Sequence, residues 1–593
     1  MSGPRELSVT DGAEAESRGA GLLSRGAWRD AVLILALGLF VTCYRVGVPP
    51  LAGTEGHRAL PADGMVRTGD WLLPRLYGRV YLTKPPMVYW LIGGVEKLTG
   101  VADETSWRMP SAMAGGLLGM ALCLVGNYWF GRTAGLVAGL CHVGLIALVE
   151  GYRSADIDAL DIAASVMTAL GMIELLSGPN RRRWRLTIFT GLGFGAVLLL
   201  KGPGGLPVVL GAVLGAAIFN VEWIAVGRSR WLKRPRWEEY FLAIGPRIGA
   251  CILALVLGLC MFGAYAMTAY ESVRRQGLPL DTSGLAEALR KSSQLVSQFA
   301  DVAKMPFMLA AFCLPVSAVV PFVLRSEIWY GGDARRRWYL RALVGTLAMS
   351  LAICFLSGMS NVRYAYVIVP PLALVAGALA DRVARGEIGG ELRLALWRGV
   401  WVSLTLMFVA AVYMGIASHR GADRADILHV ICGGVIALAG WLMVMRRMRG
   451  SAWPGRGGVF VLMIGLGLNM AMLSNHRRVA RSTAGEAQIL TDHVKSGEVI
   501  MTGLTALDQP ELFYYAHVEA FTYGNLMLTP FVLPRDGWVV LKGAEFTAWT
   551  SEKPACVSNI IPVVPQRGND QDAIYLAWYT RPPLVAATTR GSQ

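Results

Sequence analysis

Long apolar runs alternate with short polar segments along most of the chain. A helix that crosses a bilayer needs about 20 mainly apolar residues, and many windows of this sequence approach or meet that length. The pattern therefore predicts a polytopic, mainly α-helical membrane protein. The apolar runs lie near residues 28–46, 84–99, 110–130, 133–150, 158–177, 186–200, 204–224, 245–270, 305–324, 339–358, 364–384, 396–417, 426–445 and 457–474.

The positive charge of the chain follows the same alternation. Of the 593 residues, 54% are hydrophobic and 16% are charged, and the formal net charge is +15. We reject a nucleic-acid-binding function because the arginines form short clusters between apolar runs, as in NRRRWR (180–185) and DARRRW (333–338). Such clusters are typical of cytoplasmic loops in membrane proteins.

The arginine clusters also decide how many runs cross the membrane. If every run crosses and the N-terminus is inside, the clusters at 180–185, 228–237 and 333–338 fall outside, against the positive-inside tendency. They all move inside if one early run does not cross. The run 84–99 is short and opens with two prolines, which is typical of an interfacial segment. We therefore predict about thirteen transmembrane helices, with 84–99 lying at the outer membrane surface.

This topology divides the chain into four parts. The polar residues 1–27 are predicted to be a disordered cytoplasmic tail. Residues 28–474 are predicted to form the transmembrane domain, whose first outer loop, 47–109, carries juxtamembrane helices. Residues 475–593 contain short alternating runs such as GWVVLKG and are predicted to form a small α/β domain on the outer side.

Charged residues at the ends of spans are costly and are therefore candidates for function. Asp158 begins one span, and Lys201 directly follows another in VLLLKGPGGLP. Lys84 precedes Pro85 and Pro86, which are tolerated in the first turn of a helix. The free N–H groups of that turn favour an anion, so Lys84 predicts a phosphate site. The alternatives are lysines that only mark the interface and an Asp158 that lies in headgroup water.

A second set of phosphate donors precedes a later span. Arg363 and Tyr364 lie in SGMSNVRYAYVIVPP, and a guanidinium and a phenol can both donate to phosphate oxygens. A place in the aromatic belt of the membrane interface is the alternative for Tyr364.

The first outer loop resembles a known family. Residues 54–91 are similar to the aminoarabinose transferase (ArnT) and protein mannosyltransferase group of the GT-C superfamily. In that group an acidic motif is followed by Met-x-x-x-Gly-Asp-Trp, a proline and Lys-Pro-Pro. The resemblance extends over residues 28–385 and includes Lys201-Gly202-Pro203. The matching residues of the first loop are Met65, Gly69, Asp70, Trp71, Pro74, Lys84, Pro85 and Pro86.

The acidic motif departs from the family pattern. The family often has Asp-Glu-x-Arg-Tyr, whereas this chain has Thr54-Glu55-Gly56-His57-Arg58. The position of the aspartate holds Thr54, so Glu55 has to supply the carboxylate. The position of the arginine holds His57, unless Arg58 takes it over.

The resemblance implies a multi-pass enzyme of the bacterial inner membrane, with its active site and C-terminal domain in the periplasm. It would transfer a sugar from a polyprenyl-phosphate donor to an acceptor by inverting displacement. Cations would stabilise the leaving phosphate, and carboxylates would act on the acceptor and the anomeric carbon. The implied catalytic residues are Glu55 and Asp158, the donor phosphate ligands Lys84, Lys201, Arg363 and Tyr364, and further acceptor or donor contacts His57, Arg58, Arg290 and Lys304.

Several alternatives stay open at this point. Lipid A or another envelope glycolipid is the favoured acceptor, and a protein acceptor, as in protein O-mannosyltransferases, is the other. A transporter or flippase of lipid-linked sugars would place its charges deep within the spans rather than at one face. We expect no metal ligand cluster, although some members of the superfamily use a divalent metal. We also expect a monomer.

Overall fold

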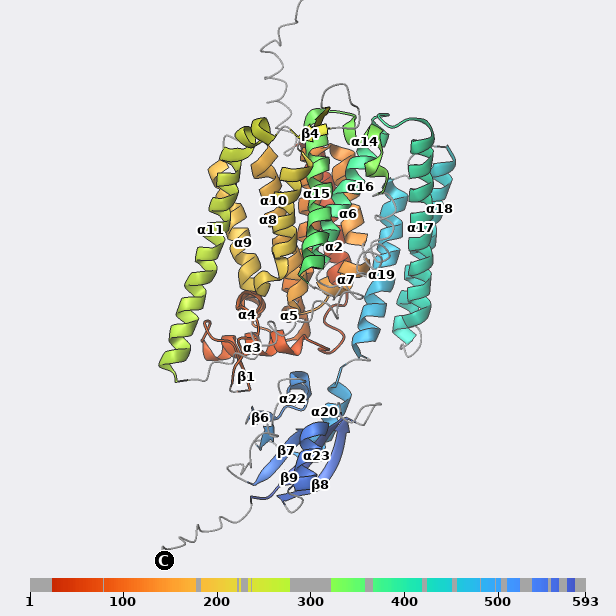
Figure 1. Ribbon diagram of the computed structural model, residues 1–593. Coiled ribbons are helices and arrows are strands. Elements are labelled where there is room, and N and C mark those ends of the chain that lie inside the picture. The colour runs from red at the N-terminus through yellow and green to blue at the C-terminus, as the bar shows by residue number, and fades with distance from the viewer. Residues whose placement is uncertain are drawn as a thin grey trace, which may run out of the picture.

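The computed structural model shows a helical bundle with a small sheet at one end (Figure 1). The first-loop helices α3 and α4 lie at the same end of the bundle as this sheet, whereas β4 and α14 lie at the other. We call the first of these the α3 end. The structure describes residues 24–77, 79–144, 146–177, 183–220, 223–225, 233–235, 237–277, 321–357, 366–418, 424–450, 456–479, 482–495, 498–502, 509–522, 536–552, 556–564 and 573–581.

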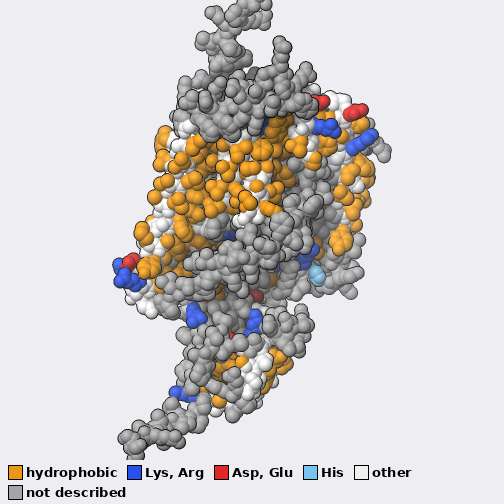
Figure 2. Space-filling view, viewed as in Figure 1, with side chains coloured by type: hydrophobic (Ala, Val, Ile, Leu, Met, Phe, Trp, Pro, Cys, Tyr) orange, Lys and Arg blue, Asp and Glu red, His pale blue; other side chains and the backbone are white. Residues whose placement is uncertain are grey.

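Within these residues, nine helices are long and apolar enough to cross a membrane. Figure 2 shows an apolar surface over the bundle, with charged side chains toward its two ends. The protein is thus a multi-pass membrane protein, as the sequence predicts. The helices of the bundle are α2 (Arg25–Cys43), α5 (Glu104–Trp129), α6 (Arg132–Gly144), α7 (Ile146–Tyr152), α8 (Ile157–Ser177), α9 (Arg183–Lys201), α10 (Leu206–Phe219), α11 (Trp237–Arg275), α14 (Ser326–Tyr330), α15 (Ala334–Leu356), α16 (Val369–Ala384), α17 (Gly390–Ser418), α18 (Arg424–Gly450) and α19 (Arg456–Val479).

Two predicted runs differ in the structure. The run 133–150 contains two helices, α6 and α7, rather than one. The run 204–224 gives only the 14 residues of α10, because the 3-10 turn η2 (Gly202–Gly205) precedes it and Asn220 follows it. The predicted tail 1–27 and the predicted span 305–324 lie almost wholly outside the described residues.

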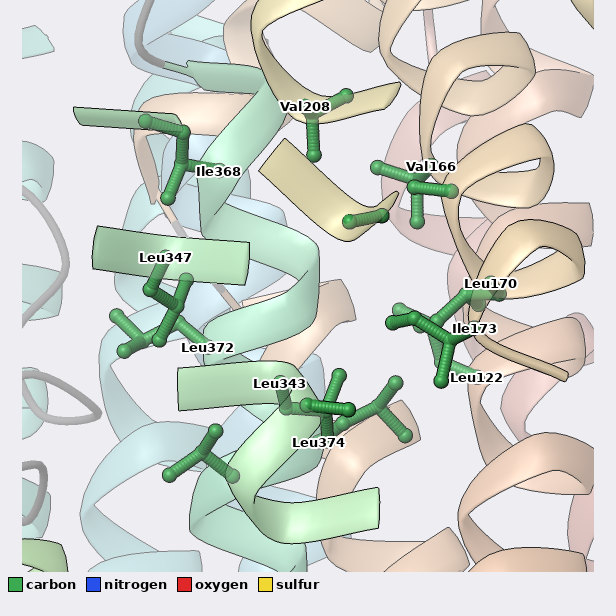
Figure 3. Close-up of a cluster of buried hydrophobic side chains, with 14 of the residues drawn as sticks. Leu122, Val166, Leu170, Ile173, Val208, Leu343, Leu347, Ile368, Leu372 and Leu374 are labelled. Carbon is green, nitrogen blue, oxygen red and sulfur yellow. The ribbon is translucent and has the colours of Figure 1, made fainter. Parts of the chain in front are cut away.

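The core of the bundle lies between α5, α8, α10, α15 and α16. Leucine, isoleucine and valine side chains of these helices meet there, among them Leu122, Val166 and Leu347 (Figure 3). Glycines allow α10 and α15 to approach closely, because a Cβ atom on Gly215 would collide with the backbone of Gly345. Small residues at helix contacts are the usual way of bringing helices together in membranes.

The first loop forms two short helices and a hairpin at the α3 end. The helices are α3 (Gly56–Thr68) and α4 (Met87–Thr99), and between them β1 (Arg75–Leu76) pairs with β2 (Arg79–Val80). The 13 residues of α4 measure about 20 Å, too short for a hydrocarbon core of about 30 Å. Pro86 caps α4, so the two prolines do begin this helix.

The C-terminal unit, residues 482–581, packs beneath the first loop. Its five-stranded mixed sheet has the order β6-β5-β7-β9-β8. Tyr77 of the first loop donates a hydrogen bond to the carbonyl of Pro510, 2.5 Å away. The elements of the unit are α20 (Ala484–His493), β5 (Val499–Thr502), α22 (Pro510–Tyr515), β6 (Glu519–Thr522), β7 (Gly537–Lys542), α23 (Gly543–Glu552), β8 (Val557–Val564) and β9 (Ile574–Tyr579). The described strands outside it and the first loop are β3 (Trp223–Ala225) and β4 (Lys233–Pro235).

Candidate active site

Lys201 and Asp158 form a close ion pair at the α3 end. The ammonium at the last residue of α9 lies 2.5 Å from Asp158 Oδ1, in the first turn of α8. The buried Asp161 lies one turn further along α8, with its Oδ2 3.8 Å from the same ammonium. Gly202, at φ +65°, turns the chain away directly after the lysine. Two residues that the sequence predicted for the site are therefore in contact.

Lys84 is half-buried at the start of α4 and belongs to the same cluster of charges. Its pKa lies below the ordinary value of a lysine, first because burial disfavours the ammonium and second because Arg58 and Lys201 repel it. Asp158 and Asp156 attract the ammonium and oppose this shift. The five residues are Arg58 of α3, Lys84 in the segment before α4, Asp156 in the turn between α7 and α8, Asp158 of α8 and Lys201 of α9. We call them the charge cluster.

Asp156 lies in this cluster and is held by the acidic motif of the first loop. Its Oδ2 accepts a hydrogen bond from Thr54 Oγ1, 2.6 Å away, and its Oδ1 accepts one from the backbone N–H of Ile157, at 2.7 Å. Arg58 Nε is 3.9 Å from Oδ1. The carboxylate is therefore fixed on two sides, and its side chain stays partly exposed, at 16%.

Aromatic rings border the charge cluster. The rings of His57 and Tyr81 have centroids 6.0 Å apart. Tyr89 of α4 is fully buried and lies close to Arg58 and Tyr81. Cations next to aromatic rings suit a ligand that combines a phosphate with a sugar, because phosphate needs charged donors and the rings offer flat apolar faces.

Glu55 has different surroundings from those expected of the catalytic residue that the sequence suggested. It is 2% exposed, and its two oxygens accept five hydrogen bonds. Arg108 donates twice, over 2.8 Å each, and Arg478 donates once, over 2.7 Å. The backbone N–H groups of Ala52 and Ala155 supply the other two. Burial alone would raise the pKa of Glu55, but the two guanidinium groups outweigh it and hold the pKa below its ordinary value.

Arg108 likewise has all of its hydrogen-bonding groups occupied. Besides its bonds to Glu55, it donates to the carbonyl oxygens of Val46, Pro49 and Pro50, so all five of its N–H groups are used. Together, Glu55 and Arg108 tie α5 and α19 to the first loop and to the turn before α8. A carboxylate with every strong acceptor position occupied is poorly suited to contact a substrate. The geometry thus favours a positioning role for Glu55 over the predicted catalytic one.

Four of the predicted site residues, Arg290, Lys304, Arg363 and Tyr364, lie outside the described residues. The other six, Glu55, His57, Arg58, Lys84, Asp158 and Lys201, all lie at the α3 end. Within the described part of the chain, no three His, Cys, Asp or Glu side chains gather in an arrangement that would hold a metal ion.

Known proteins share both sequence and fold with this chain. Residues 83–235 match the family described as dolichyl-phosphate-mannose-protein mannosyltransferase. The chain is 26% identical over 375 residues to the undecaprenyl phosphate-alpha-4-amino-4-deoxy-L-arabinose arabinosyl transferase of Pseudomonas aeruginosa strain UCBPP-PA14, over 61% of each protein. It is 29% identical over 176 residues to arabinosyl transferase 2 of Pseudomonas fluorescens Pf-5, over 28% of each. The chain thus matches less than two thirds of the length of these relatives.

The fold comparison covers almost the whole chain. The crystal structure of ArnT from Cupriavidus metallidurans bound to undecaprenyl phosphate has a TM-score of 0.64 at 18% identity, covering 96% of this chain and 100% of that one. The chain has the ArnT fold. The apo structure of the same protein gives a TM-score of 0.62 and covers 92% of this chain and 97% of that one. The resemblance seen in the first loop is thus confirmed as a similarity to ArnT proteins in sequence and in fold.

The sequence missed three residues that this ArnT-like site brings together. Arg108 and Arg478 form the buried cluster with Glu55, and Thr54 holds Asp156. A charge near the end of an apolar run was the available signal for both arginines. For Thr54 there was no chemical signal, since a threonine on a loop is ordinary.

Proposed function

We propose that this protein is a membrane glycosyltransferase that transfers a sugar from a polyprenyl-phosphate carrier to an acceptor. The convergence of Lys84, Lys201 and Arg58 beside Asp156 and Asp158 at one end of an ArnT-like bundle carries the proposal. The names of the relatives and of the matching family support the same class of reaction.

The three cations of the charge cluster hold the donor phosphate. Cleavage of the bond between sugar and phosphate leaves a second negative charge on the phosphate, and fixed ammonium and guanidinium groups stabilise this charge. Lys84 is suited to this role because burial and its cationic neighbours leave it short of counter-charge. Arg363 and Tyr364 are proposed to add donors, and His57 to contact the donor or the acceptor. Arg290 and Lys304 keep the same proposed contact role.

Asp158 is proposed to face the anomeric carbon. Its contact with Lys201 fixes its orientation. An ionised carboxylate there stabilises the oxocarbenium-like transition state of a direct, inverting displacement. The same contact couples the carboxylate to the cation that binds the leaving phosphate.

We propose lipid A or another envelope glycolipid as the acceptor, since the relatives aligned over the longest stretches are aminoarabinosyl transferases. A protein acceptor is the second candidate, because the family that matches residues 83–235 is described as a protein mannosyltransferase. A transporter of lipid-linked sugars is less well supported, since the charge cluster lies at one end of the bundle rather than along a path through it.

We propose that the α3 end faces the periplasm, with thirteen spans in a bacterial inner membrane. The arginines at the start of α15 lie near α14, at the opposite end of the bundle, which fits a cytoplasmic location for that end. The proposed division is a transmembrane domain over 28–474 and a periplasmic domain over 475–593.

The test is a transfer assay with purified protein. Labelled polyprenyl-phosphate sugars are incubated with lipid A, with a de-acylated glycolipid or with a serine-rich peptide, and products are separated by chromatography. We expect a labelled lipid product and its loss in Lys84→Ala. Transport of the intact donor into vesicles without any transfer would overturn the proposal in favour of a flippase. A labelled peptide would support the second candidate.

A further inference from the structure

We propose that Asp156, held by Thr54, is the catalytic base that takes the proton from the attacking O–H group of the acceptor. This inference rests on the proposed glycosyl transfer. It assigns to Asp156 the role on the acceptor that the sequence had suggested for Glu55.

The first argument is the occupancy of the neighbouring carboxylates. Glu55 accepts five hydrogen bonds and is buried. Asp158 is in contact with Lys201 at 2.5 Å, and the side chain of Asp161 is only 1% exposed. In contrast, Asp156 forms only a long ion pair within the described part of the chain, with Arg58 Nε 3.9 Å from its Oδ1. Of these four carboxylates, Asp156 is thus the partly exposed one that makes no ion pair shorter than 3.9 Å among the described residues.

The second argument is how firmly Asp156 is held. Thr54 Oγ1 and the N–H of Ile157 fix one oxygen each, and Ser111 Oγ donates to its backbone carbonyl over 3.1 Å. The preceding residue, Ala155, donates its N–H to Glu55. The buried cluster around Glu55 therefore positions the turn that carries Asp156. A base held in this way needs little reorganisation when the acceptor arrives.

The third argument is the proximity of Asp156 to the proposed phosphate site. Asp156 and Lys84 are close enough to interact electrostatically. The anomeric carbon of the donor is one bond away from a phosphate oxygen, so an acceptor that attacks this carbon must come near the same residues. A partly exposed carboxylate beside the phosphate ligands is therefore in the region where the nucleophile has to be deprotonated.

The step balances as follows. The acceptor oxygen forms its bond to the anomeric carbon while its proton moves to a carboxylate oxygen of Asp156. The bond between the anomeric carbon and the phosphate oxygen breaks, and its electron pair stays on the phosphate. Asp156 then releases the proton to water. The attacking O–H group belongs to a sugar hydroxyl or to a singly protonated phosphate monoester, and the two kinds of acceptor are assayed separately.

Asp156→Asn and Asp156→Ala distinguish a role as catalytic base from a role as helix cap, because asparagine caps helices as well as aspartate does but cannot take up the proton. We expect both variants to lower kcat by at least about 10²-fold, the usual contribution of a general base. Binding of undecaprenyl phosphate and the melting temperature should stay unchanged. Added formate should raise the rate of Asp156→Ala at least tenfold. It should leave the rate of Asp156→Asn unchanged, because the amide occupies the space.

The decisive variant exchanges the two side chains that share the hydrogen bond between residues 54 and 156. The double variant Thr54→Asp, Asp156→Thr exchanges the two partners of the hydrogen bond between Thr54 Oγ1 and Asp156 Oδ2, which are 2.6 Å apart in the wild type. The carboxylate then belongs to residue 54 instead of residue 156. We expect this double variant to recover at least tenfold in kcat over Asp156→Thr alone. Asp333→Asn, at the opposite end of the bundle, is the matched control and should keep full activity.

The two proposals fail in different ways. A wild-type protein without any transfer would remove the proposed function. Wild-type activity that persists in Asp156→Asn, with either kind of acceptor, would overturn the role of Asp156 and leave the proposed function standing. Loss of activity without rescue by formate or by the relocated carboxylate would also overturn the base role.

Discussion

Arg108 and Glu55 form a bidentate ion pair in which both hydrogen bonds measure 2.8 Å and both side chains are almost completely buried. The partners come from α5 and the loop before α3, and Arg478 of α19 joins them from a position 423 residues away. An ion pair of this kind fixes orientation because neither partner can leave without stranding a charge.

Glu55→Gln should therefore act on stability before it acts on catalysis. The substitution removes the negative charge that both buried guanidinium groups contact, and breaking a buried pair typically costs about 3–5 kcal/mol. We expect a melting temperature several degrees lower in detergent, with transfer lost in proportion to unfolding. The matched comparison is Asp156→Asn, which should lose activity without melting earlier. A Glu55→Gln protein with wild-type stability but no activity would restore the catalytic role that the sequence suggested.

The sequence predicts the helices well because apolar length is a local property. Each predicted run that lies in the described residues contains helix, and α4 has the short length, directly after two prolines, that is expected of an interfacial helix. Hydropathy cannot show where a run is interrupted. For this reason the division of 133–150 into α6 and α7 was missed.

The site was predicted in part, for a physical reason that Glu55 illustrates. Motif spacing brought Lys84, Asp158 and Lys201 together correctly, since each lies at the end of a predictable helix. The role of Glu55, however, depends on partners 53 and 423 residues away, and nothing in its own loop reveals them. A local pattern therefore cannot distinguish a catalytic carboxylate from a positioning one.

Lys84 should make donor binding sensitive to alkaline pH. Its pKa is lowered by burial and by Arg58 and Lys201, against the attraction of Asp158 and Asp156. The ammonium is the form that binds the donor phosphodiester, so affinity should fall as the pH rises through this lowered pKa. We expect binding to weaken at a lower pH than the ordinary pKa of a lysine would give in the wild type, and to stay constant in Lys84→Arg. Titration of labelled donor into both proteins measures this, and parallel curves would contradict it.

Lys201 and Asp158 should act as a coupled pair. Lys201→Met leaves Asp158 without its contact at 2.5 Å, and Asp158→Asn removes the negative charge closest to the ammonium, since Asp161 lies at 3.8 Å. We expect each single variant to lose about 10²–10³-fold in rate, as for removal of one preorganised charge. The double variant should lose far less than the product of the two, because contacting residues are not additive. Additive losses in a double-mutant cycle would show that the two groups act separately.

The proposed orientation can be tested by labelling. Leu98, on α4, is 88% exposed, and Ala334, at the start of α15, is exposed at the opposite end. In a background without the exposed Cys260 and Cys432, Leu98→Cys should react with an impermeant thiol reagent in intact spheroplasts. Ala334→Cys should react only after permeabilisation. The reverse pattern would place the charge cluster on the cytoplasmic side.

Glu511 should make the docking of the C-terminal unit depend on pH. Its carboxylate lies buried against Gly56 at the start of α3, and among the described residues its Oε2 has no hydrogen-bond partner. Burial, followed by repulsion from Glu55, raises its pKa from 4.5 to about 7. The docked state therefore favours the protonated acid. Its stabilising effect is complete below pH 4.5 and is lost as the pH rises through 7, by about 3 kcal/mol in total.

Glu511→Gln removes this dependence because the amide stays neutral. We expect the variant to match the wild type at pH 5 and to exceed it at pH 8 in the melting temperature and in the hydrogen-exchange protection of α22. Glu498→Gln, at the surface of the same unit, is the control and should leave the pH difference of the wild type intact. If protection of α22 in the wild type is the same at pH 5 and pH 8, then Glu511 is neutralised by a group that faces it in the docked state, and the titration does not control docking.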